Sequence, residues 1–491
     1  MPRFYLFFLC VFLLIPDLYA AGDAPFFPIP SESLEQIDNL PPGPLAVISG
    51  AGISGLAAAF ELRAQGYEVV VVEKREFFSR FNIINLNIEV QVFLKKFGLL
   101  EEFEKFVAAR ILEHKTVLIT KDGAEVLDIS HVSDLKLDPS FAFKSKNFSQ
   151  LFRKDGVYSV QIAVLLDFLA KKARDIGVHI ISDAEVDILE TSPAGGVQTL
   201  GITAKKHQIQ TVTLHPDLFF IAEGAHSSTA YSLGFNTTTI SNECSNESWV
   251  YGNFDYSGDH TFVISFVDAS QGNLRIANII FNAQKKLANV AVTADATITS
   301  EDIRKLLESV AQQAFHIAEL PFDPRSLVTA SRPVRIENQI ATEFSRDNIY
   351  LLGDTVFHSS PLAGLGGTLA LTLVPHTVSV LLQTLAGSPE DAKETFRRYS
   401  EAYAHRWLEK SVHVKKIILG LYEQKREKIR TQDDELADEL GISVNDLPLL
   451  RDLQRDVELG SLTPVAFLRT LPSAFLVFLF TVGVVDQRKM L

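Results

Sequence analysis

A glycine-rich turn between a strand and a helix most constrains how this chain of 491 residues can fold. The hexapeptide Gly50-Ala51-Gly52-Ile53-Ser54-Gly55 follows an apolar stretch at 45–49 and precedes a helix-forming stretch at 56–65. A second apolar stretch, 68–72, ends at Glu73, which lies 23 residues after Gly50. This order predicts a β-α-β unit that binds a dinucleotide, with Glu73 on a ribose hydroxyl. A glycine-rich turn without a ligand is the alternative interpretation.

Each residue of the turn has an expected role at such a site. Gly50 permits the tight turn, Gly52 lets a pyrophosphate approach the backbone, and Gly55 lets the helix pack close to the sheet. Ile53 and Ser54 lie between these glycines and are further candidates for cofactor binding, because the N-terminus of the following helix supplies free N–H groups for phosphates.

Composition places the chain among ordinary globular proteins that have room for two or three domains. Hydrophobic residues make up 47% and charged residues 22% of the chain. The net charge of −14 argues against a nucleic-acid partner, because such partners need basic surfaces. Cys10 and Cys244 are the two cysteines, and the sequence has no H-E-x-x-H motif, so we expect no metal site.

The N-terminus is typical of a targeting segment. A short basic start is followed by an apolar run at 4–15, which suits a signal peptide and is short for a membrane-spanning helix. Residues 1–21 are therefore predicted to be a cleaved signal peptide or an uncleaved anchor. We expect an exported or membrane-associated protein, with a cytoplasmic location as the alternative.

The C-terminus is apolar as well. Residues 464–485 carry one charge, Arg469, and Pro472 interrupts the run. A helix packed on the protein body and an element for membrane-surface contact are both consistent with this composition. Peripheral membrane contact through either apolar end is thus an expectation.

Hydrophobic periodicity predicts the remaining elements only coarsely. We expect strands at 178–181, 218–222 and 349–352 and a β-sheet over 249–292, with strand-like residues also at 117–126. We expect helices at 87–106, at 160–176, from about 367, at 389–426 and at 431–459.

Two later segments add polar groups at the ends of predicted strands. Glu223-Gly224 follows the strand at 218–222, and Gly353-Asp354 follows the strand at 349–352. Seven residues after Asp354 begins the pattern Pro361-x-x-Gly364-x-Gly366. Strand ends of this kind place a carboxylate in the ligand crevice of an α/β sheet, and a glycine-rich turn at a helix start supplies N–H groups.

In this order the three segments resemble the single-component flavoprotein monooxygenases, the p-hydroxybenzoate hydroxylase-like group. The resemblance implies FAD, with its ADP half on the first segment. It places Asp354 at the ribityl chain, and Pro361, Gly364 and Gly366 at the isoalloxazine. The implied fold is α/β (α+β): a Rossmann-like FAD-binding domain of GR2 type, an inserted β-sheet substrate domain and C-terminal helices.

Within this group the stretch 73–86 looks most like the E-K-R-x-x-F-S-R-x-N-x-x-x-L segment of MICAL monooxygenase domains. There the Glu, both Arg and the Asn contact FAD, which implies contacts for Glu73, Arg75, Arg80 and Asn82. Guanidinium groups suit phosphate oxygens. Two further candidates are Lys74, inside the same segment, and Gln161, which stands where MICAL-type helices carry Arg.

The chain also departs from the family pattern. Glu223 replaces the usual Asp of the second motif, Ala230 stands at its Arg, and Thr368 stands where many members have Asn. Because Ala230 replaces this Arg, the resemblance does not extend to the way in which the family handles nicotinamide. The actin-directed activity of MICAL domains is not carried over.

This resemblance and the patterns along the chain together suggest a domain plan. Residues 44–116, 150–240 and 340–385 are expected to form a discontinuous FAD-binding domain. Residues 117–149 and 245–339 would form a β-rich substrate or cap domain. Residues 386–491 would form a C-terminal helical region with the apolar tail.

The expected function is that of an FAD-dependent oxidoreductase, an NAD(P)H-dependent monooxygenase using a flavin C4a-hydroperoxide. NADPH or NADH would be a transient reductant, and the substrate would be a small or hydrophobic molecule under the cap. No catalytic side chain is assigned. One alternative is a flavin-dependent dehydrogenase or reductase of a lipid-like substrate, and another is a non-catalytic, redox-responsive FAD-binding protein.

Overall fold

A computed structural model describes residues 27–408, with gaps at 112, 121–122, 128–156, 205–209, 241–246, 269–274, 296, 362–363 and 406, together with residue 412. By its internal contacts the chain divides into two units, Met1–Lys416 and Ile417–Leu491, and every described residue belongs to the first. The predictions for 1–21, 431–459 and 464–485 fall outside the described residues.

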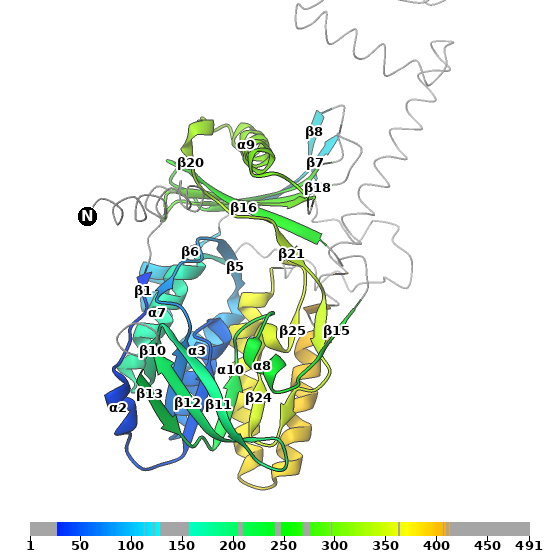
Figure 1. Ribbon diagram of the computed structural model, residues 1–491. Helices are drawn as coiled ribbons and strands as arrows, with labels where there is room; N and C mark the ends of the chain where they lie inside the picture. Colours follow the sequence, from blue (N-terminus) through cyan, green and yellow to red (C-terminus); the bar gives the residue numbers. More distant parts are fainter. Residues whose placement is uncertain are drawn as a thin grey trace, which may run out of the picture. The chain divides into compact units, whose positions relative to one another are not determined.

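A six-stranded sheet forms the centre of the first unit (Figure 1). The strand order is β10 (His179–Ser182), β3 (Glu68–Glu73), β2 (Leu45–Ser49), β14 (Leu218–Ile221), β24 (Ile349–Leu351) and β23 (Ser345–Arg346). Neighbouring strands are parallel except for the antiparallel pair β23 and β24. Helix α3 (Ile53–Ala64) connects β2 to β3, so the predicted β-α-β unit is confirmed.

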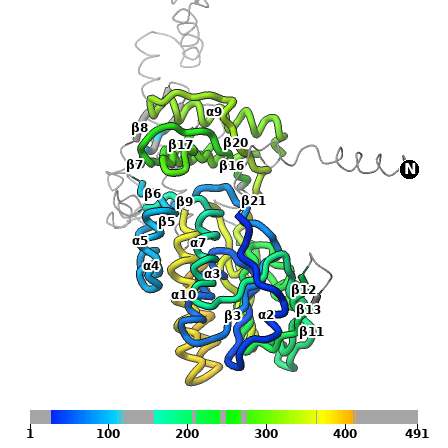
Figure 2. The backbone as a smooth tube through the Cα atoms, turned by 90° about the vertical axis from the view of Figure 1, so that its left-hand side faces the viewer, coloured from blue at the N-terminus to red at the C-terminus, as the bar shows by residue number. Residues whose placement is uncertain are grey.

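The central sheet lies between two layers (Figures 1 and 2). Helices α3, α7 (Ile162–Asp175) and α10 (Gly366–Leu385) cover one face, where α3 packs against both α7 and α10. The antiparallel strands β11 (Ala184–Thr191), β12 (Val197–Ala204) and β13 (Gln210–Leu214) lie on the other. This arrangement buries both faces of the parallel strands, which explains the unbroken valine run of β3.

Helix α10 is long and apolar enough to cross a membrane by length and composition. Of its most apolar window, however, 56% is buried inside the structure. Its partner helix α3 has small side chains that allow close packing, and Ala57, Ala58 and Ala59 are fully buried. We therefore interpret α10 as a core helix.

The prediction of a helix over 160–176 is wrong at its start. Val160 and Gln161 belong to strand β9 (Val157–Gln161), and the helix α7 begins only at Ile162. Strand β9 pairs with β5 (Ile83–Asn87) and with β6 (Ala109–Arg110), which are distant in the sequence. Hydrophobic periodicity reports only on neighbouring residues and cannot reveal these long-range strand pairings. The predicted helix therefore began two residues too early.

The helical stretch expected at 87–106 forms as four short pieces. These are η1 (Ile88–Val90), α4 (Gln91–Lys96), α5 (Leu100–Glu102) and a π-helical turn, η2 (Phe103–Val107). Gly98, with φ of +69°, breaks the run after α4, because that conformation ends a helix.

A second sheet of eight strands carries helix α9 (Ser300–Ile317) on one face (Figure 1). Its order is β20 (Leu327–Ala330), β16 (Glu247–Asp255), β19 (Leu287–Ala294), β18 (Arg275–Asn282), β17 (Phe262–Asp268), β7 (Glu113–Thr120) and β8 (Gly123–Leu127), with β21 (Val334–Ile336) beside β16. The sheet expected over 249–292 is thus confirmed. We call it the cap sheet and call the face away from α9 its inner face.

The inner face of the cap sheet meets the small sheet of β5, β9 and β6. Ile83 and Ile111 pack with Val263 and Ile280 of the cap sheet in one apolar cluster. Beside this cluster the Asn282 side chain donates a hydrogen bond to the Ser159 hydroxyl at 2.9 Å. The two sheets therefore form a contact with both apolar and polar parts.

The smaller elements connect these layers. They are β1 (Phe27–Pro28) paired with β4 (Phe77–Phe78), the sheet of β15 (Thr237–Thr239), β22 (Gln339–Ala341) and β25 (Phe357–His358), helices α2 (Leu34–Asp38) and α8 (Ser228–Ser232), and the 3-10 turns η6 (Pro324–Ser326) and η7 (Gly353–Thr355). After α10, residues 389–405 and 407–408 are helical, within the helix predicted at 389–426.

The glycines of the turn give a direct test of this packing. A Cβ at Gly55 would lie 2.0 Å from the Gly50 carbonyl oxygen, whereas a Cβ at Gly52 would meet nothing closer than 3.9 Å. Gly55→Ala should lower the free energy of unfolding by about 3 kcal/mol, because backbone must move. Gly52→Ala, the matched control, should change it by no more than about 1 kcal/mol. Equal unfolding midpoints in urea for the two variants would contradict this packing.

Candidate functional site

A cavity of about 480 Å³ opens at the carboxyl ends of β2, β3, β14 and β24. The adjacent ends of parallel strands are where α/β sheets bind ligands. Most of the predicted site residues line this cavity: Gly50, Gly52, Ile53, Ser54, Glu73, Lys74, Arg75, Arg80, Glu223, Gly224, Asp354 and Gly366. The chain therefore brings its three separated motifs to one place.

The glycine-rich turn presents the N-terminus of α3 to the cavity. Gly50 has φ of +109°, and a Cβ there would lie 2.4 Å from the Ala222 carbonyl oxygen, so only glycine fits. Gly52 is the N-cap of α3, and the first N–H groups of the helix have no acceptor within it. Partial positive charge and free N–H groups thus point to an anion.

Glu73 is fixed in place by backbone donors on both sides. The side chain is only 7% exposed, and its two carboxylate oxygens accept from Ala51 N at 2.9 Å and from Arg75 N at 3.1 Å. These bonds hold a carboxylate at the end of β3, beside the turn. Its remaining lone pairs can accept the hydroxyls of a ribose.

Three cationic side chains surround the same cavity. Lys74, Arg75 and Arg80 are exposed, and within the described ranges none of them has an ion-pair partner. Together with the N-terminus of α3 they form a site suited to a pyrophosphate.

Asp354 closes the cavity from the side of β24. It follows Gly353, whose φ is +60° and where a Cβ would lie 2.1 Å from the Ser54 hydroxyl. The Asp354 carboxyl is open to the cavity but otherwise surrounded by protein, and this burial raises its pKa while Arg80 opposes the rise. A carboxyl in this setting is ready to accept hydrogen bonds from the hydroxyls of a bound ligand.

Residues 45–408 match the family model described as FAD binding domain. This match covers more than half of the chain and all of the cavity described above. The chain belongs to this FAD-binding family. FAD is therefore the cofactor of this chain. The cavity offers chemically suitable partners for it: the anion site for a pyrophosphate, Glu73 for a ribose and Asp354 for a polyol.

Solved structures with the same fold include an oxygenase and a monooxygenase by their names. One is 2-methyl-3-hydroxypyridine-5-carboxylic acid oxygenase, mutant C294A (17% identity, 79% of this chain, 92% of that chain, TM-score 0.55). Another is p-nitrophenol 4-monooxygenase PnpA from Pseudomonas putida DLL-E4 (17% identity, 77% and 98%, TM-score 0.54). A third is tetracycline destructase Tet(51) (15% identity, 80% and 96%, TM-score 0.52). At these identities the likeness shows the fold alone, which confirms the predicted class. No curated protein sequence matches the chain.

Glu223, at the second motif of this FAD-binding chain, is occupied by internal hydrogen bonds. Its carboxylate accepts from the hydroxyls of Ser49 at 2.5 Å, Thr229 at 2.5 Å and Ser227 at 2.7 Å, and from Thr229 N at 3.2 Å. Burial alone would raise the pKa of Glu223, but these donors outweigh burial and lower it. Glu223 therefore ties β2 to α8 and shapes the wall of the FAD cavity.

Five predicted residues lie outside the cavity lining: Gly55, Asn82, Gln161, Pro361 and Gly364. Gly55 is buried beneath the turn, as expected from its packing role. Asn82 accepts from the N–H of Ile162 through its backbone carbonyl, and the Gln161 amide donates to the Phe81 carbonyl at 3.4 Å. These two residues support the start of α7 behind the FAD site. The structure thus gives Asn82 and Gln161 a supporting position rather than a place on the lining.

Other lining residues were not singled out from the sequence. They are Phe78, Ile84, Ile162, Leu166, the segment 184–187, Ser228, Thr229, Ser232, Leu352, Gly367, Ala370 and Trp407, with the neighbours of the predicted residues. The segment 184–187 begins β11, with one residue between it and the end of β10, so the rule that ligands bind at the carboxyl ends of strands could have found it. Trp407 carries no such pattern.

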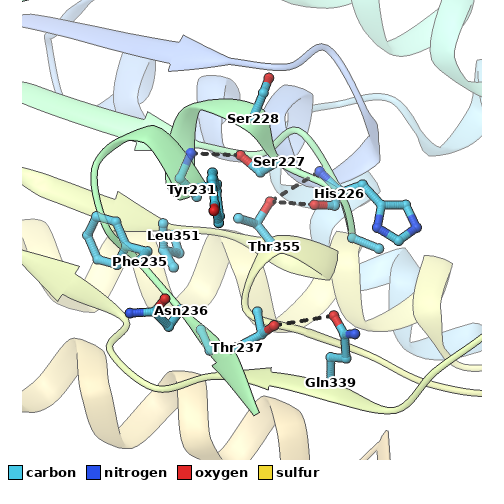
Figure 3. A pocket seen from close by; sticks show the side chains of 14 residues that line it. His226, Ser227, Ser228, Tyr231, Phe235, Asn236, Thr237, Gln339, Leu351 and Thr355 are labelled. Carbon is cyan, nitrogen blue, oxygen red and sulfur yellow. Dashed lines mark hydrogen bonds between the residues drawn. The ribbon is translucent and has the colours of Figure 1, made fainter. Parts of the chain in front are cut away.

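A second cavity, of about 440 Å³, lies on the other side of the second motif (Figure 3). Gly224 and Ser228 line both cavities, so this segment is the wall between them. The Thr355 hydroxyl accepts from Gly224 N at 3.1 Å and holds this wall to η7. Ala230, at the position of the family's Arg, is one of the lining residues.

The hydrogen bonds of Glu223 predict a pH-dependent stability. Because its folded-state pKa is below the ordinary 4.5, its stabilisation is present above that value and is lost as the pH falls through the lowered pKa. Glu223→Gln should lower the free energy of unfolding by about 1–3 kcal/mol at pH 7, because the amide N–H₂ group would face hydroxyl and N–H donors. The difference in melting temperature between the Glu223→Gln variant and the parent protein should become smaller below about pH 4.

The exposed Glu101 on α5 offers a matched control. Glu101→Gln should leave the melting temperature unchanged across the same pH range. A Glu223→Gln protein as stable as the parent at pH 7 would show that the four bonds do not hold α8 to the sheet.

Proposed function

We propose that the protein is an NAD(P)H-dependent FAD monooxygenase of a small molecule held between the FAD cavity and the inner face of the cap sheet. The main support for this proposal is that the FAD cavity and the inner face of the cap sheet lie next to each other. Arg80 lines the cavity, and the backbone carbonyl of its neighbour Phe81 accepts a hydrogen bond at 3.4 Å from the amide of Asn253 on the inner face. On the same face, burial raises the pKa of the Tyr251 hydroxyl to about 12, and the nearby Arg80 opposes this rise. The printed names of two similar structures, an oxygenase and a monooxygenase, support the same reaction class.

The inner face near Tyr251 is polar and uncharged. The Asn289 amide donates to the Asn253 carbonyl oxygen at 2.7 Å, and the Asn253 amide donates to the Phe81 carbonyl at 3.4 Å. The Thr329 hydroxyl is buried beside them and has no hydrogen-bond partner among the described residues. A buried, unpartnered hydroxyl costs free energy unless a ligand or water satisfies it. This face favours a neutral substrate with hydrogen-bonding groups over a lipid-like one.

The chain's own groups would hold the cofactor and position the substrate. Lys74, Arg75 and the N-terminus of α3 would bind the pyrophosphate, Glu73 the ribose, and Asp354 the polyol. When bound, FAD would supply the redox chemistry, namely hydride acceptance from NAD(P)H and insertion of one oxygen atom of O₂ into the substrate, with the other oxygen atom leaving as water. The cap sheet would exclude solvent from this reaction.

The first test is an absorption spectrum of the purified full chain before and after anaerobic addition of NADPH. We expect the two visible bands of oxidised flavin, and we expect NADPH to bleach them. In ¹⁸O₂, a hydroxylated product should then carry one labelled oxygen. Bleaching with an unlabelled, dehydrogenated product would favour the dehydrogenase alternative. Bands that neither NADPH nor NADH bleaches would favour the non-catalytic alternative.

The cations of the cavity give a second test. Arg75→Gln and Arg80→Gln should each weaken FAD binding by about 10-fold, because a charge-assisted hydrogen bond contributes roughly 1.5–3 kcal/mol. Arg325 is 89% exposed and pairs only with Asp323 among the described residues, so Arg325→Gln is the matched control and should bind FAD normally. Titration of apoprotein with FAD measures all three. Unchanged affinity in both cavity variants would contradict the anion site.

We also propose that residues 1–21 direct export or membrane attachment, with the apolar ends as the elements for membrane contact. The apolar run at 4–15 supports this. N-terminal sequencing of the protein recovered from its own cell separates the cases: a start near residue 22 means cleavage, and an intact start in a membrane fraction means an anchor. An intact N-terminus in the soluble fraction would contradict the proposal.

A further inference from the structure

The helical segment after α10 brings Trp407 to the lining of the FAD cavity and places Tyr403 one turn before it, outside the lining. Tyr403 and Trp407 are four residues apart in this helix, so they lie on one face of it. Their side chains are only 4% and 5% exposed, and their rings meet edge to face with centroids 6.0 Å apart. The Trp407 ring also packs against Phe357 of β25, at 5.7 Å between centroids. The pair is therefore held firmly on both sides.

Each of the two side chains lies near a predicted cofactor residue. Trp407 lines the FAD cavity, and a Cβ at Gly366 would lie 2.9 Å from the indole ring. The glycine at the start of α10 thus leaves room for the indole. Tyr403 lies near Asp354: burial raises the pKa of its hydroxyl well above its usual range, and the Asp354 carboxylate raises it further.

The polar atoms of the pair lack partners. The Tyr403 hydroxyl and the Trp407 indole nitrogen are buried, and neither has a hydrogen-bond partner among the residues that the structure describes. Leaving a buried donor unpaired costs about 1–3 kcal/mol. Two such donors, one helical turn apart and beside a cavity for a polar cofactor, are explained if the cofactor supplies the acceptors.

We propose that Tyr403 and Trp407 are cofactor-binding residues whose O–H and N–H groups donate hydrogen bonds to the flavin half of FAD. Glu73 and the turn at 50–55 take the adenosine half and the pyrophosphate, as in dinucleotide sites generally. Asp354, Gly366 and Trp407 line the cavity beyond them, where the flavin half remains to be bound. The inference rests on FAD binding and requires no turnover, so it stands apart from the monooxygenase proposal.

Two conservative variants of the full chain test the donors separately. Trp407→Phe and Tyr403→Phe keep an aromatic ring and remove the hydrogen-bonding group. Each should raise the dissociation constant of FAD for the apoprotein about 3- to 10-fold, while that of ADP stays unchanged. The melting temperature of the apoprotein should stay equal or rise for Tyr403→Phe, because a buried hydroxyl that has no partner among the described residues is removed. The control is Tyr399→Phe, one turn earlier in the helix, where the ring packs against His376.

Tryptophan fluorescence gives a reading that does not depend on affinity. The chain has two tryptophans, so Trp249→Phe leaves Trp407 as its only indole. We expect FAD to quench the emission of Trp407 in this variant and ADP to leave it unchanged.

Three results would overturn the proposal. One is wild-type affinity for FAD in both donor variants. Another is a less stable Tyr403→Phe apoprotein that binds FAD normally, which would assign the hydroxyl to an ordered water. The third is Trp407 emission that FAD does not quench. A chain that binds FAD and passes these tests but oxidises no NADPH would contradict only the proposed function.

Discussion

The site depends on one close backbone contact, between the glycine-rich turn and the end of β14. Gly50 lies against the Ala222 carbonyl, and Gly55 lies against the carbonyl of Gly50. No side chain fits between these groups, so the first turn of α3 sits directly over the ends of β2 and β14. That placement aims the free N–H groups of the helix into the cavity. The anion site, the position of Glu73 and the approach of Ser54 to Gly353 all follow from it.

The charged side chains around the cavity differ in whether they have hydrogen-bond or ion-pair partners inside the protein. Glu73 and Glu223 accept hydrogen bonds from backbone N–H and hydroxyl donors, which hold both carboxylates in fixed positions at the cavity wall. Asp354 keeps its carboxyl open to the cavity, and Lys74, Arg75 and Arg80 keep their charge without an ion pair in the described part of the chain. An acidic protein can in this way maintain a local site for a dianionic cofactor.

Sequence patterns predicted those parts of the structure that depend on neighbours along the chain. The β-α-β unit is such a case, because its alternation of strand, turn and helix is complete within about thirty residues. Strand β9 was mistaken for the start of a helix, since its partners are at 83–87 and 109–110. The partners of Glu223 could not be predicted either: Ser49 lies 174 residues away and becomes a neighbour only through the pairing of β2 with β14. Trp407 lies far from every motif and enters the site only through packing of its helix.

The most direct measurement is an experimental structure of the full chain with FAD bound. We expect the pyrophosphate beside the N-terminus of α3, the adenosine ribose at Glu73, and the flavin half beside Asp354 and Gly366, facing the inner face of the cap sheet. FAD found in the second cavity, behind Gly224, or bound with its flavin half at Glu73, would contradict the account.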